Sequence, residues 1–263
     1  MPNENRDSFA ELNQVQGRRR GVAAVPRQRV GFLQSMALQV SGLSRRVPGQ
    51  PSALFTDVSL SVARGGVAVV RAPSGSGKTL LLRLLALLDR VPEGASLRLD
   101  GQSVEEVGGA AAWRARVAYV SQSRVGLRGT VGALFSGAAG FKSQGGQGSL
   151  GSRQGSGALL AELLEATGLS ADVVGRHWSD LSGGEFQRAL LCVTLALAPD
   201  VLLLDEPTSA CDPESAAKVE RAVLSAGCTV VWVSHDPGQE ERLRQEAEGA
   251  GREHQVMHLG GAP

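Results

Sequence analysis

Eight consecutive residues have the types and order of a phosphate-binding loop. They lie between a valine-rich and a leucine-rich segment and are Ala72, Pro73, Ser74, Gly75, Ser76, Gly77, Lys78 and Thr79. Glycines at 75 and 77 allow successive backbone N–H groups to turn toward a polyphosphate, and the N-terminus of a following helix adds partial positive charge. In such a loop, Lys78 reaches the β and γ phosphates and the Thr79 hydroxyl binds Mg²⁺. Ala72 replaces the first glycine of the G-x-x-x-x-G-K-[ST] pattern, so a chance Gly/Ser-rich turn is the alternative.

Ionisable side chains follow two apolar segments later in the chain. Asp205 and Glu206 come after the apolar residues 201–204, and His235 comes two residues after the apolar residues 229–233. Ligands bind at the carboxyl ends of parallel strands, so these side chains are expected at one sheet edge. Asp205 is suited to hold Mg²⁺, usually through water, while Glu206 can polarise a water that attacks a γ-phosphate and His235 can contact that phosphate. Taken singly, a solvated strand end or a surface histidine is the simpler explanation.

A second glycine-rich turn is expected to begin a helix. The sequence LSGGE occupies residues 181–185. Ser182 is suited to be the N-cap of the helix that follows, because its hydroxyl can accept a bond from a free backbone N–H group. Gly183 and Gly184 expose further N–H groups at this helix end. The chain therefore has a second candidate site for an anion, far from the first in sequence.

Short apolar segments that alternate with helical patterns must position these groups. A chain of 263 residues with 42% hydrophobic and 4% aromatic residues suits one α/β unit with irregular segments. Strands are expected at residues 38–43, 58–62, 67–71, 96–99, 117–121, 201–204, 229–233 and 255–259. Helices are expected at residues 79–88, 158–167 and 185–198. The candidate phosphate loop then joins a strand to a helix, which is the context that phosphate binding requires.

Two segments depart from this pattern. Residues 1–35 carry six arginines and three acidic residues without apolar periodicity, so a flexible N-terminal arm is expected, with a targeting role as a further possibility. One domain is expected over residues 36–260, with a helical subdomain at about 123–198. Residues 132–157 contain nine glycines mixed with Ser and Gln. Such a composition buries little apolar area, so these residues are expected to form a flexible insertion.

In their order along the chain, the motifs resemble those of the ATP-binding subunits of ABC transporters. Residues 72–79 are similar to Walker A, Gln122 in YVSQ to the Q-loop, 181–185 to the signature, 201–207 (VLLLDEP) to Walker B, 209–212 (SACD) to the D-loop and His235 to the switch histidine. The resemblance extends from residue 37 to residue 259 and implies an α/β P-loop NTPase of the ABC type. Such a fold has a RecA-like core, an antiparallel β subdomain and a helical signature subdomain. The spacing of 104 positions from Lys78 to Ser182 accommodates that helical subdomain without a long coiled-coil insert.

The resemblance also implies an activity. It implies a stand-alone subunit that hydrolyses ATP with Mg²⁺ and couples hydrolysis to solute movement through a membrane-spanning subunit on a separate chain. Two such subunits stack head to tail, so that Ser182, Gly183 and Gly184 act on the nucleotide held by the other copy's Walker A. The implied catalytic residues are Glu206, His235, Gln122 and Lys78, and the implied Mg²⁺ ligands are Thr79, Gln122 and Asp205. Location on the cytoplasmic, or organelle stromal or matrix, face of a membrane follows from this role.

Two further details bear on the resemblance. The family usually stacks adenine on an aromatic residue upstream of Walker A, and the region near Arg46 and Val47 has none, which implies a higher KM or a looser preference for adenine. The segment after the Q-loop usually contacts the membrane partner, and the apolar residues Val125, Leu127 and Val131 are the candidates here, with ordinary core packing as the alternative. LSGGEFQR and VWVSHD are similar to small subunits linked to bacterial metal-ion export and plant aluminium tolerance.

Charge and composition restrict the other functions. Lys and Arg total 27 against 26 Asp and Glu, and the net charge of +1 provides no global field for nucleic acid or anionic lipid. No apolar stretch approaches the roughly 20 residues that a membrane-spanning helix needs. The three cysteines form no CxxC pair and are expected to be reduced thiols. The remaining alternatives are a soluble ABC-type ATPase that acts on ribosomes or DNA, and an ATP-dependent binding switch with negligible hydrolysis.

Overall fold

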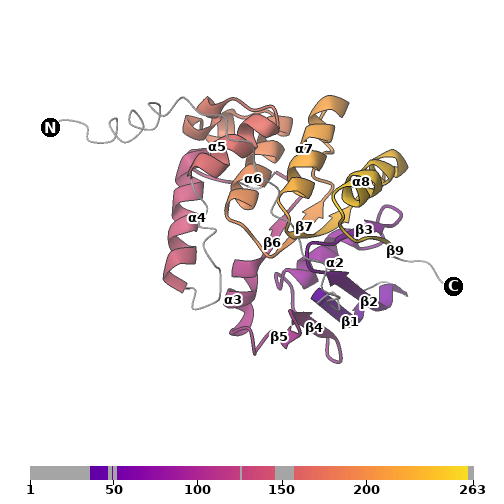
Figure 1. The fold of residues 1–263 in the computed structure, drawn as a ribbon. Helices are drawn as coiled ribbons and strands as arrows, with labels where there is room; N and C mark the ends of the chain where they lie inside the picture. Colours follow the sequence, from indigo (N-terminus) through magenta and orange to yellow (C-terminus); the bar gives the residue numbers. More distant parts are fainter. Residues whose placement is uncertain (1–35, 47–48, 50–51, 125, 146–156, 260–263) are drawn as a thin grey trace. The chain divides into compact units, whose positions relative to one another are not determined.

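A parallel sheet of five strands lies at the centre of the computed structural model, which describes residues 36–46, 49, 52–124, 126–145 and 157–259 (Figure 1). The arm predicted at residues 1–35 lies outside the described residues. The strands, in spatial order, are β6 (Val117–Val120), β7 (Val201–Asp205), β8 (Thr229–Val233), β3 (Val67–Arg71) and β9 (His254–His258). All residues of β7 and β8 are buried, as expected for strands covered on both faces. These five strands confirm the corresponding sequence predictions.

The helices that carry or support the motifs follow the strands in the expected alternation. They are α2 (Lys78–Leu85), α3 (Gly109–Arg116), α4 (Val131–Gly145), α5 (Gly157–Ala166), α6 (Gly183–Ala196), α7 (Pro213–Ser225) and α8 (Pro237–Gly249), with short 3-10 turns η2 (Ala171–Gly175) and η3 (Trp178–Asp180). One face of the parallel sheet packs on leucines of α2, and the other packs on apolar side chains of α6, α7 and α8. The sheet therefore has a hydrophobic core on each face, and this packing holds the strand ends in position relative to one another.

A second, antiparallel sheet packs on the core that contains α2. Its strands, in spatial order, are β2 (Ala53–Ala63), β1 (Met36–Arg46), β4 (Ser96–Leu99) and β5 (Gln102–Ser103). Leu38 pairs with Leu99, Val40 pairs with Leu60, and these four side chains are buried together with Leu82 of α2. The α/β core with an antiparallel β subdomain that the motifs implied is thus confirmed.

A third buried cluster belongs to the helices between β6 and β7. It includes Val131 and Phe135 of α4, Leu164 of α5, and Trp178 and Phe186, whose rings meet edge to face with centroids 5.1 Å apart. α5 and α6 lie side by side in this region (Figure 1). The signature turn therefore belongs to a packed helical unit with a core of its own.

The flexible insertion predicted from residue 132 is wrong in its first half. Residues 132–145 continue helix α4, while 146–156 lie outside the described residues. Val131 and Phe135 are buried in the third core, and this packing stabilises helix α4 although glycines lower its intrinsic helix propensity. A Cβ on Gly132 would meet Val174 Cγ1 at 2.8 Å. At this position glycine serves a close approach of two backbones, which composition alone cannot distinguish from flexibility.

The described residues contain no helix that combines the length and the apolar character needed to cross a bilayer. The cysteines are unpaired, as predicted: Cys192, Cys211 and Cys228 are all free. Burial raises the pKa of the Cys192 and Cys228 thiols to about 11. Both therefore stay protonated at neutral pH and are poor nucleophiles.

A buried ion pair joins α7 to α8, and a substitution there tests how much it contributes to the stability of the fold. Glu220 is 2% exposed and accepts two bonds from Arg242 at 2.9 Å. Arg242→Ala is expected to lower the free energy of unfolding by about 2 kcal/mol, because a buried carboxylate loses its cation while the partial exposure of Arg242 moderates the loss. Urea denaturation measures this. The control Arg244→Ala removes only exposed pairs with Glu241 and Glu248 and is expected to be nearly neutral; equal losses in both variants contradict the prediction.

Candidate functional site

The loop between β3 and α2 has the backbone of a phosphate cradle. Gly75 and Gly77 adopt φ angles of 80° and 90°, which side-chain-bearing residues rarely adopt. Ala72 is not among the residues with positive φ, so its methyl group is tolerated where the pattern has glycine. A Cβ on Gly77 would approach Phe55 Cε1 at 3.1 Å, because strand β2 packs directly against the loop. The loop shape is thus set by glycine geometry and by the neighbouring sheet.

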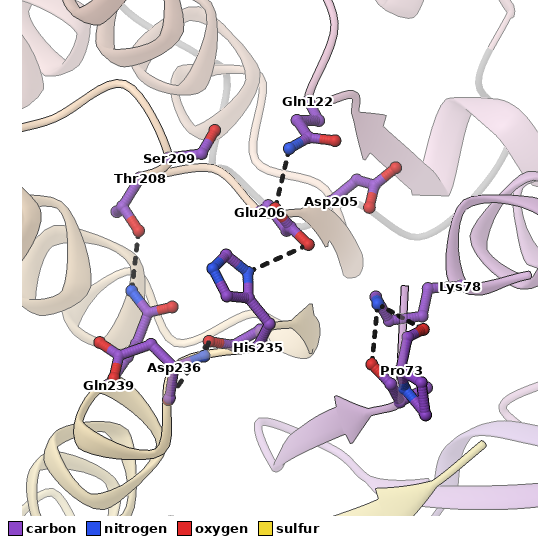
Figure 2. A network of polar contacts seen from close by, with 12 residues as sticks. Pro73, Lys78, Gln122, Asp205, Glu206, Thr208, Ser209, His235, Asp236 and Gln239 are labelled. Carbon is purple, nitrogen blue, oxygen red and sulfur yellow. Dashed lines mark hydrogen bonds and ion pairs between the residues drawn. The ribbon is translucent and has the colours of Figure 1, made fainter. Parts of the chain in front are cut away.

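Lys78 crosses this loop. Its Nζ donates to the carbonyl oxygens of Ala72 at 2.8 Å and of Pro73 at 3.1 Å (Figure 2). The Ser76 hydroxyl also donates to the Pro73 carbonyl, at 2.8 Å. The ammonium group therefore stays over the cradle, where the N-terminus of α2 adds its partial positive charge. This part of the site suits the phosphates of a nucleotide.

Asp205 connects the phosphate loop to the end of β7. Thr79 Oγ1 donates to Asp205 Oδ2 at 2.7 Å, and the Tyr119 hydroxyl donates to the same oxygen at 3.2 Å. Burial, followed by the charge of Asp205, raises the pKa of Tyr119, so its hydroxyl remains a donor at neutral pH. Thr79 and Asp205 supply the hard oxygen donors that Mg²⁺ prefers, and waters and phosphates usually complete its shell. The residues present thus fit a magnesium ion.

Glu206 lies between two other motifs. Gln122 Nε2 donates to Glu206 Oε2 at 2.8 Å, and His235 Nδ1 lies 3.3 Å from Glu206 Oε1 (Figure 2). The backbone N–H of Glu206 donates to the Val233 carbonyl at 3.2 Å, which ties the end of β7 to the end of β8. Glu206 also has a φ of 48°, a conformation that costs about 1 to 3 kcal/mol in a non-glycine residue and is common at active sites. The orientation of the Glu206 carboxylate is therefore fixed by its contacts with Gln122 and His235 and by the backbone at the end of β7.

The signature turn is held by a capping box. Ser182 Oγ accepts from the Glu185 N–H at 3.3 Å, and Glu185 Oε2 accepts from the Ser182 N–H at 2.8 Å. Arg176 donates to the other Glu185 oxygen at 2.8 Å. A Cβ on Gly184 would lie 2.8 Å from the Ala210 carbonyl, so glycine is needed where α6 meets the D-loop. Within the described residues, the side-chain bonds of residues 181–185 do not reach the phosphate loop of the same chain.

Two glutamines that sequence reasoning did not assign link the motifs. Gln187 donates to the Gln122 carbonyl at 3.3 Å and to Ser209 Oγ at 3.2 Å, and it accepts from the Ala210 N–H at 3.1 Å. Gln239 donates to Thr208 Oγ1 at 2.8 Å. Both glutamines are buried on the inner faces of helices. A polar residue on an otherwise apolar helix face was the signal that could have identified them.

A cavity of about 490 Å³ opens beside Glu206 and His235. It is bounded by the loop that contains Thr208, Ser209 and Cys211. Asp205, Glu206 and His235 lie at one sheet edge, as predicted from the strand ends, and Gln122 joins them through its bond to Glu206, whereas the signature turn has its own separate neighbours. Tyr119 was quoted in YVSQ without a role, and only the structure places its hydroxyl on Asp205.

The end of the β1–β2 hairpin adjoins the phosphate loop and presents arginines. Arg45 pairs with Phe55 and Arg46 with Ala53, and Leu54 and Phe55 contact the position of Gly77. Among the described side chains, the phenylalanines and tryptophans are buried, and Tyr119 is half-buried on Asp205. Val47 lies outside the described residues. No described aromatic ring is thus exposed here to stack a nucleotide base.

Comparisons with known proteins agree with this geometry. The ABC transporter family model matches residues 55–209. The chain is 34% identical over 254 residues to the phosphate import ATP-binding protein PstB 2 of Natronomonas pharaonis, covering 85% of this chain and 84% of that protein. It is 36% identical over 210 residues to Protein STAR1 of Oryza sativa subsp. japonica, covering 78% of this chain and 58% of that protein. It is 36% identical over 209 residues to the Fe(3+) ions import ATP-binding protein FbpC 1 of Rhodococcus jostii, covering 76% and 55%.

Solved structures share the fold. An ATP-binding subunit of an ABC transporter superimposes with a TM-score of 0.66 at 20% identity, covering 79% of this chain and 82% of that chain. A bacterial Atm1-family ABC exporter with ATP bound superimposes with a TM-score of 0.61 at 24% identity, covering 82% of this chain and 37% of the exporter. At these identities the likeness concerns the fold.

The capping box gives a pH-dependent prediction. The Arg176 guanidinium, followed by the Ser182 N–H, lowers the pKa of Glu185 from its usual 4.5 to about 2. A carboxyl group whose pKa is lower in the folded state contributes its full stabilisation at pH values above its pKa in the unfolded state. This contribution is lost as the pH falls toward its pKa in the folded state. Glu185→Gln is therefore expected to unfold at lower urea concentration at pH 7, with the difference from the parent shrinking below pH 4.5 and vanishing near pH 2. A difference that stays constant with pH contradicts this origin.

Proposed function

Because the chain belongs to the ABC transporter family, as an ATP-binding subunit that hydrolyses ATP, we propose that two copies close head to tail on two ATP molecules and drive a separate membrane-spanning subunit. One observation carries the proposal: the Glu206 carboxylate is held by Gln122 and His235 at the sheet edge that also holds Asp205. The phosphate loop, with the Lys78 ammonium group above it, follows β3, which is separated from β7 by β8 in the same sheet. Binding and hydrolytic groups are thus supplied by one edge of one sheet.

The phosphate loop binds the nucleotide first. Backbone N–H groups freed by the positive φ angles of Gly75 and Gly77 face the phosphates. Lys78 exchanges its bonds to the carbonyls of Ala72 and Pro73 for bonds to the β and γ phosphates. Ser74 adds its N–H group to the cradle, and Ser76 adds its own by exchanging its 3.3 Å bond to the Pro73 carbonyl for a phosphate oxygen. Thr79, Asp205 and Gln122 would hold Mg²⁺, which neutralises phosphate charge when bound.

Glu206 acts as the general base. Its carboxylate accepts a proton from a water as the water oxygen bonds to the γ-phosphorus and the bond to the β-phosphate oxygen breaks, giving ADP and phosphate. Gln122 and His235 hold the carboxylate in position, so no reorganisation is needed in the transition state. His235 is exposed, with 69% of its side-chain surface accessible, and contacts the γ-phosphate when the nucleotide is in place.

A second copy completes each site. The signature turn of one chain has its own capping network, which leaves the N–H groups of Gly183 and Gly184 at the helix end available to an external anion. Ser182 lies at the same helix end and accepts a single backbone bond. In a head-to-tail pair, these groups reach the γ-phosphate held by the other chain's Lys78. Each half-site is then open until the pair closes, which couples nucleotide binding to movement.

The membrane partner is proposed to dock beside the Q-loop. Val131 is fully buried in the third core, so its expected role in a partner groove is wrong and core packing explains it. Val125 lies outside the described residues, whereas Leu127 is only partly buried on the surface of that core. Leu127 is the remaining apolar contact for a partner's cytoplasmic helix. Docking there places the subunit on the cytoplasmic, or organelle stromal or matrix, face of the membrane.

The solute is proposed to be selected by the partner. Two relatives are named for import, of phosphate and of Fe(3+) ions, and a third for glutamate transport, although their ATP-binding chains are similar to this one at nearly equal identity. This chain spans 55% of FbpC 1 and 58% of STAR1, so regions of those proteins have no counterpart here. If the ATP-binding subunit supplies only mechanical work, similar subunits can serve transporters of different solutes. Action on ribosomes or DNA is not favoured, since the family match is to transporters and the net charge is only +1.

The catalytic role of Glu206 can be tested directly. Glu206→Gln is expected to keep MgATP binding, to stabilise the closed dimer and to lower kcat by about 100-fold or more, because the amide cannot accept the proton. Steady-state phosphate release and sedimentation velocity measure both effects. Lys78→Ala is the matched contrast, since it should weaken nucleotide binding itself. Unchanged kcat in Glu206→Gln removes the general-base role, and RNA- or DNA-stimulated ATPase activity of the parent favours the soluble alternative.

The missing aromatic ring predicts the base preference. With arginines at the hairpin end, ATP and GTP are expected to have kcat/KM values within about tenfold of each other, because no ring stacks specifically on adenine. Arg46→Tyr is expected to lower KM for ATP by about three- to tenfold through base stacking. Competition kinetics with both nucleotides measures the ratio. A strong ATP preference in the parent means that other groups read the base.

A further inference from the structure

Arg124 reaches from the segment after Gln122 to the turn that precedes the signature. Its Nη2 donates to the backbone carbonyls of Trp178 at 2.7 Å and Leu181 at 2.9 Å. A third carbonyl, of Ser179, lies at 3.5 Å. One guanidinium nitrogen thus bonds to the first two residues of turn η3 and to the residue immediately before the N-cap Ser182.

The same guanidinium also contacts the first turns of α6. Its Cζ lies 5.0 Å from the centroid of the Phe186 ring, in a cation–π arrangement. Phe186 is 3% exposed and packs edge-on against Trp178, which is 1% exposed. Arg124 therefore contacts the signature turn on both sides of Ser182: it bonds to backbone carbonyls before Ser182 and stacks on the Phe186 ring after it.

The other end of this link reaches the catalytic carboxylate. Gln122, two residues before Arg124, donates from Nε2 to Glu206 at 2.8 Å. The Gln122 carbonyl accepts from Gln187 of α6 at 3.3 Å. A stretch of three residues, 122–124, thus connects the group that activates water with the turn that serves another nucleotide. Because only one residue separates Gln122 from Arg124, a displacement of Gln122 is expected to move Arg124 as well.

We propose that Arg124 is a positioning residue that sets the orientation of the signature according to the state of the nucleotide site in its own chain. The inference rests on the proposed function, because the signature meets nucleotide only in the head-to-tail pair. A displacement of Gln122 by bound nucleotide moves Arg124, and Arg124 moves the helix end that carries Ser182, Gly183 and Gly184. Arginine suits this task because its planar group bonds to carbonyls along its edge while its face covers a ring, which lysine cannot do.

The first measurement is the stability of the closed dimer in a Glu206→Gln background. MgATP-dependent dimerisation is followed by sedimentation velocity, and MgADP affinity of the monomer by calorimetry. Adding Arg124→Ala is expected to weaken the dimer about tenfold or more, while MgADP affinity stays within about twofold. Arg124→Lys should recover little of the loss. Arg221→Ala is the control, since Arg221 is an exposed arginine of α7 whose side chain forms no ion pair or hydrogen bond within the described chain.

The second measurement does not depend on dimer formation. Hydrogen–deuterium exchange of residues 178–186 is compared with and without MgADP. In the parent, nucleotide is expected to change exchange there; in Arg124→Ala this nucleotide-dependent change should be lost, while the melting temperature falls by no more than about 2 °C. An Arg124→Ala dimer as tight as the parent's, or a preserved exchange response, overturns the inference. If Glu206→Gln stays monomeric with MgATP, the head-to-tail proposal fails, and the exchange response still decides the role of Arg124.

Discussion

Parallel pairing of β3, β7 and β8 is the constraint on which the site depends. In register, Val70 lies beside Val233, and Val233 lies beside Asp205. The phosphate loop, the carboxylates and His235 follow these residues directly, so all of them must emerge at one edge. The bond between Thr79 and Asp205 closes the arrangement across 126 residues of sequence. A shift of any one strand would separate the phosphate loop from Glu206, the proposed general base.

Buried polar links extend this edge into the rest of the molecule. Gln187 joins α6 to the Q-loop and to the D-loop, and Gln239 joins α8 to the loop after Glu206. Each glutamine is buried and uses several of its donors and acceptors, which makes the geometry of the loops costly to change. The catalytic loops are thus braced by side chains from helices and not only by the strands that precede them. This bracing explains how Glu206 is kept in its positive-φ conformation.

The helical unit differs from the sheet in how it is held. It has a buried core of its own, although Leu191 and Leu195 of α6 also pack in the core on one face of the parallel sheet, and the signature turn closes on itself through Ser182 and Glu185. Polar contacts from Gln187 and Arg124 join it to the Q-loop. Because the signature end of α6 packs in the unit's own core, its local packing can persist while its orientation changes, which suits the proposed pairing with a second chain.

The sequence by itself determined the sheet strands, the phosphate loop, the strand-end carboxylates and the signature cap, because each depends on local periodicity, glycine positions or capping chemistry. It misjudged residues 132–145, where Gly132 permits close packing against Val174, and Val131, whose burial depends on a core built from distant segments. The roles of Tyr119, Gln187 and Arg124 emerged only from tertiary structure. Their bonds join residues that are far apart in sequence, and no local pattern encodes which distant carbonyl or carboxylate a side chain will meet.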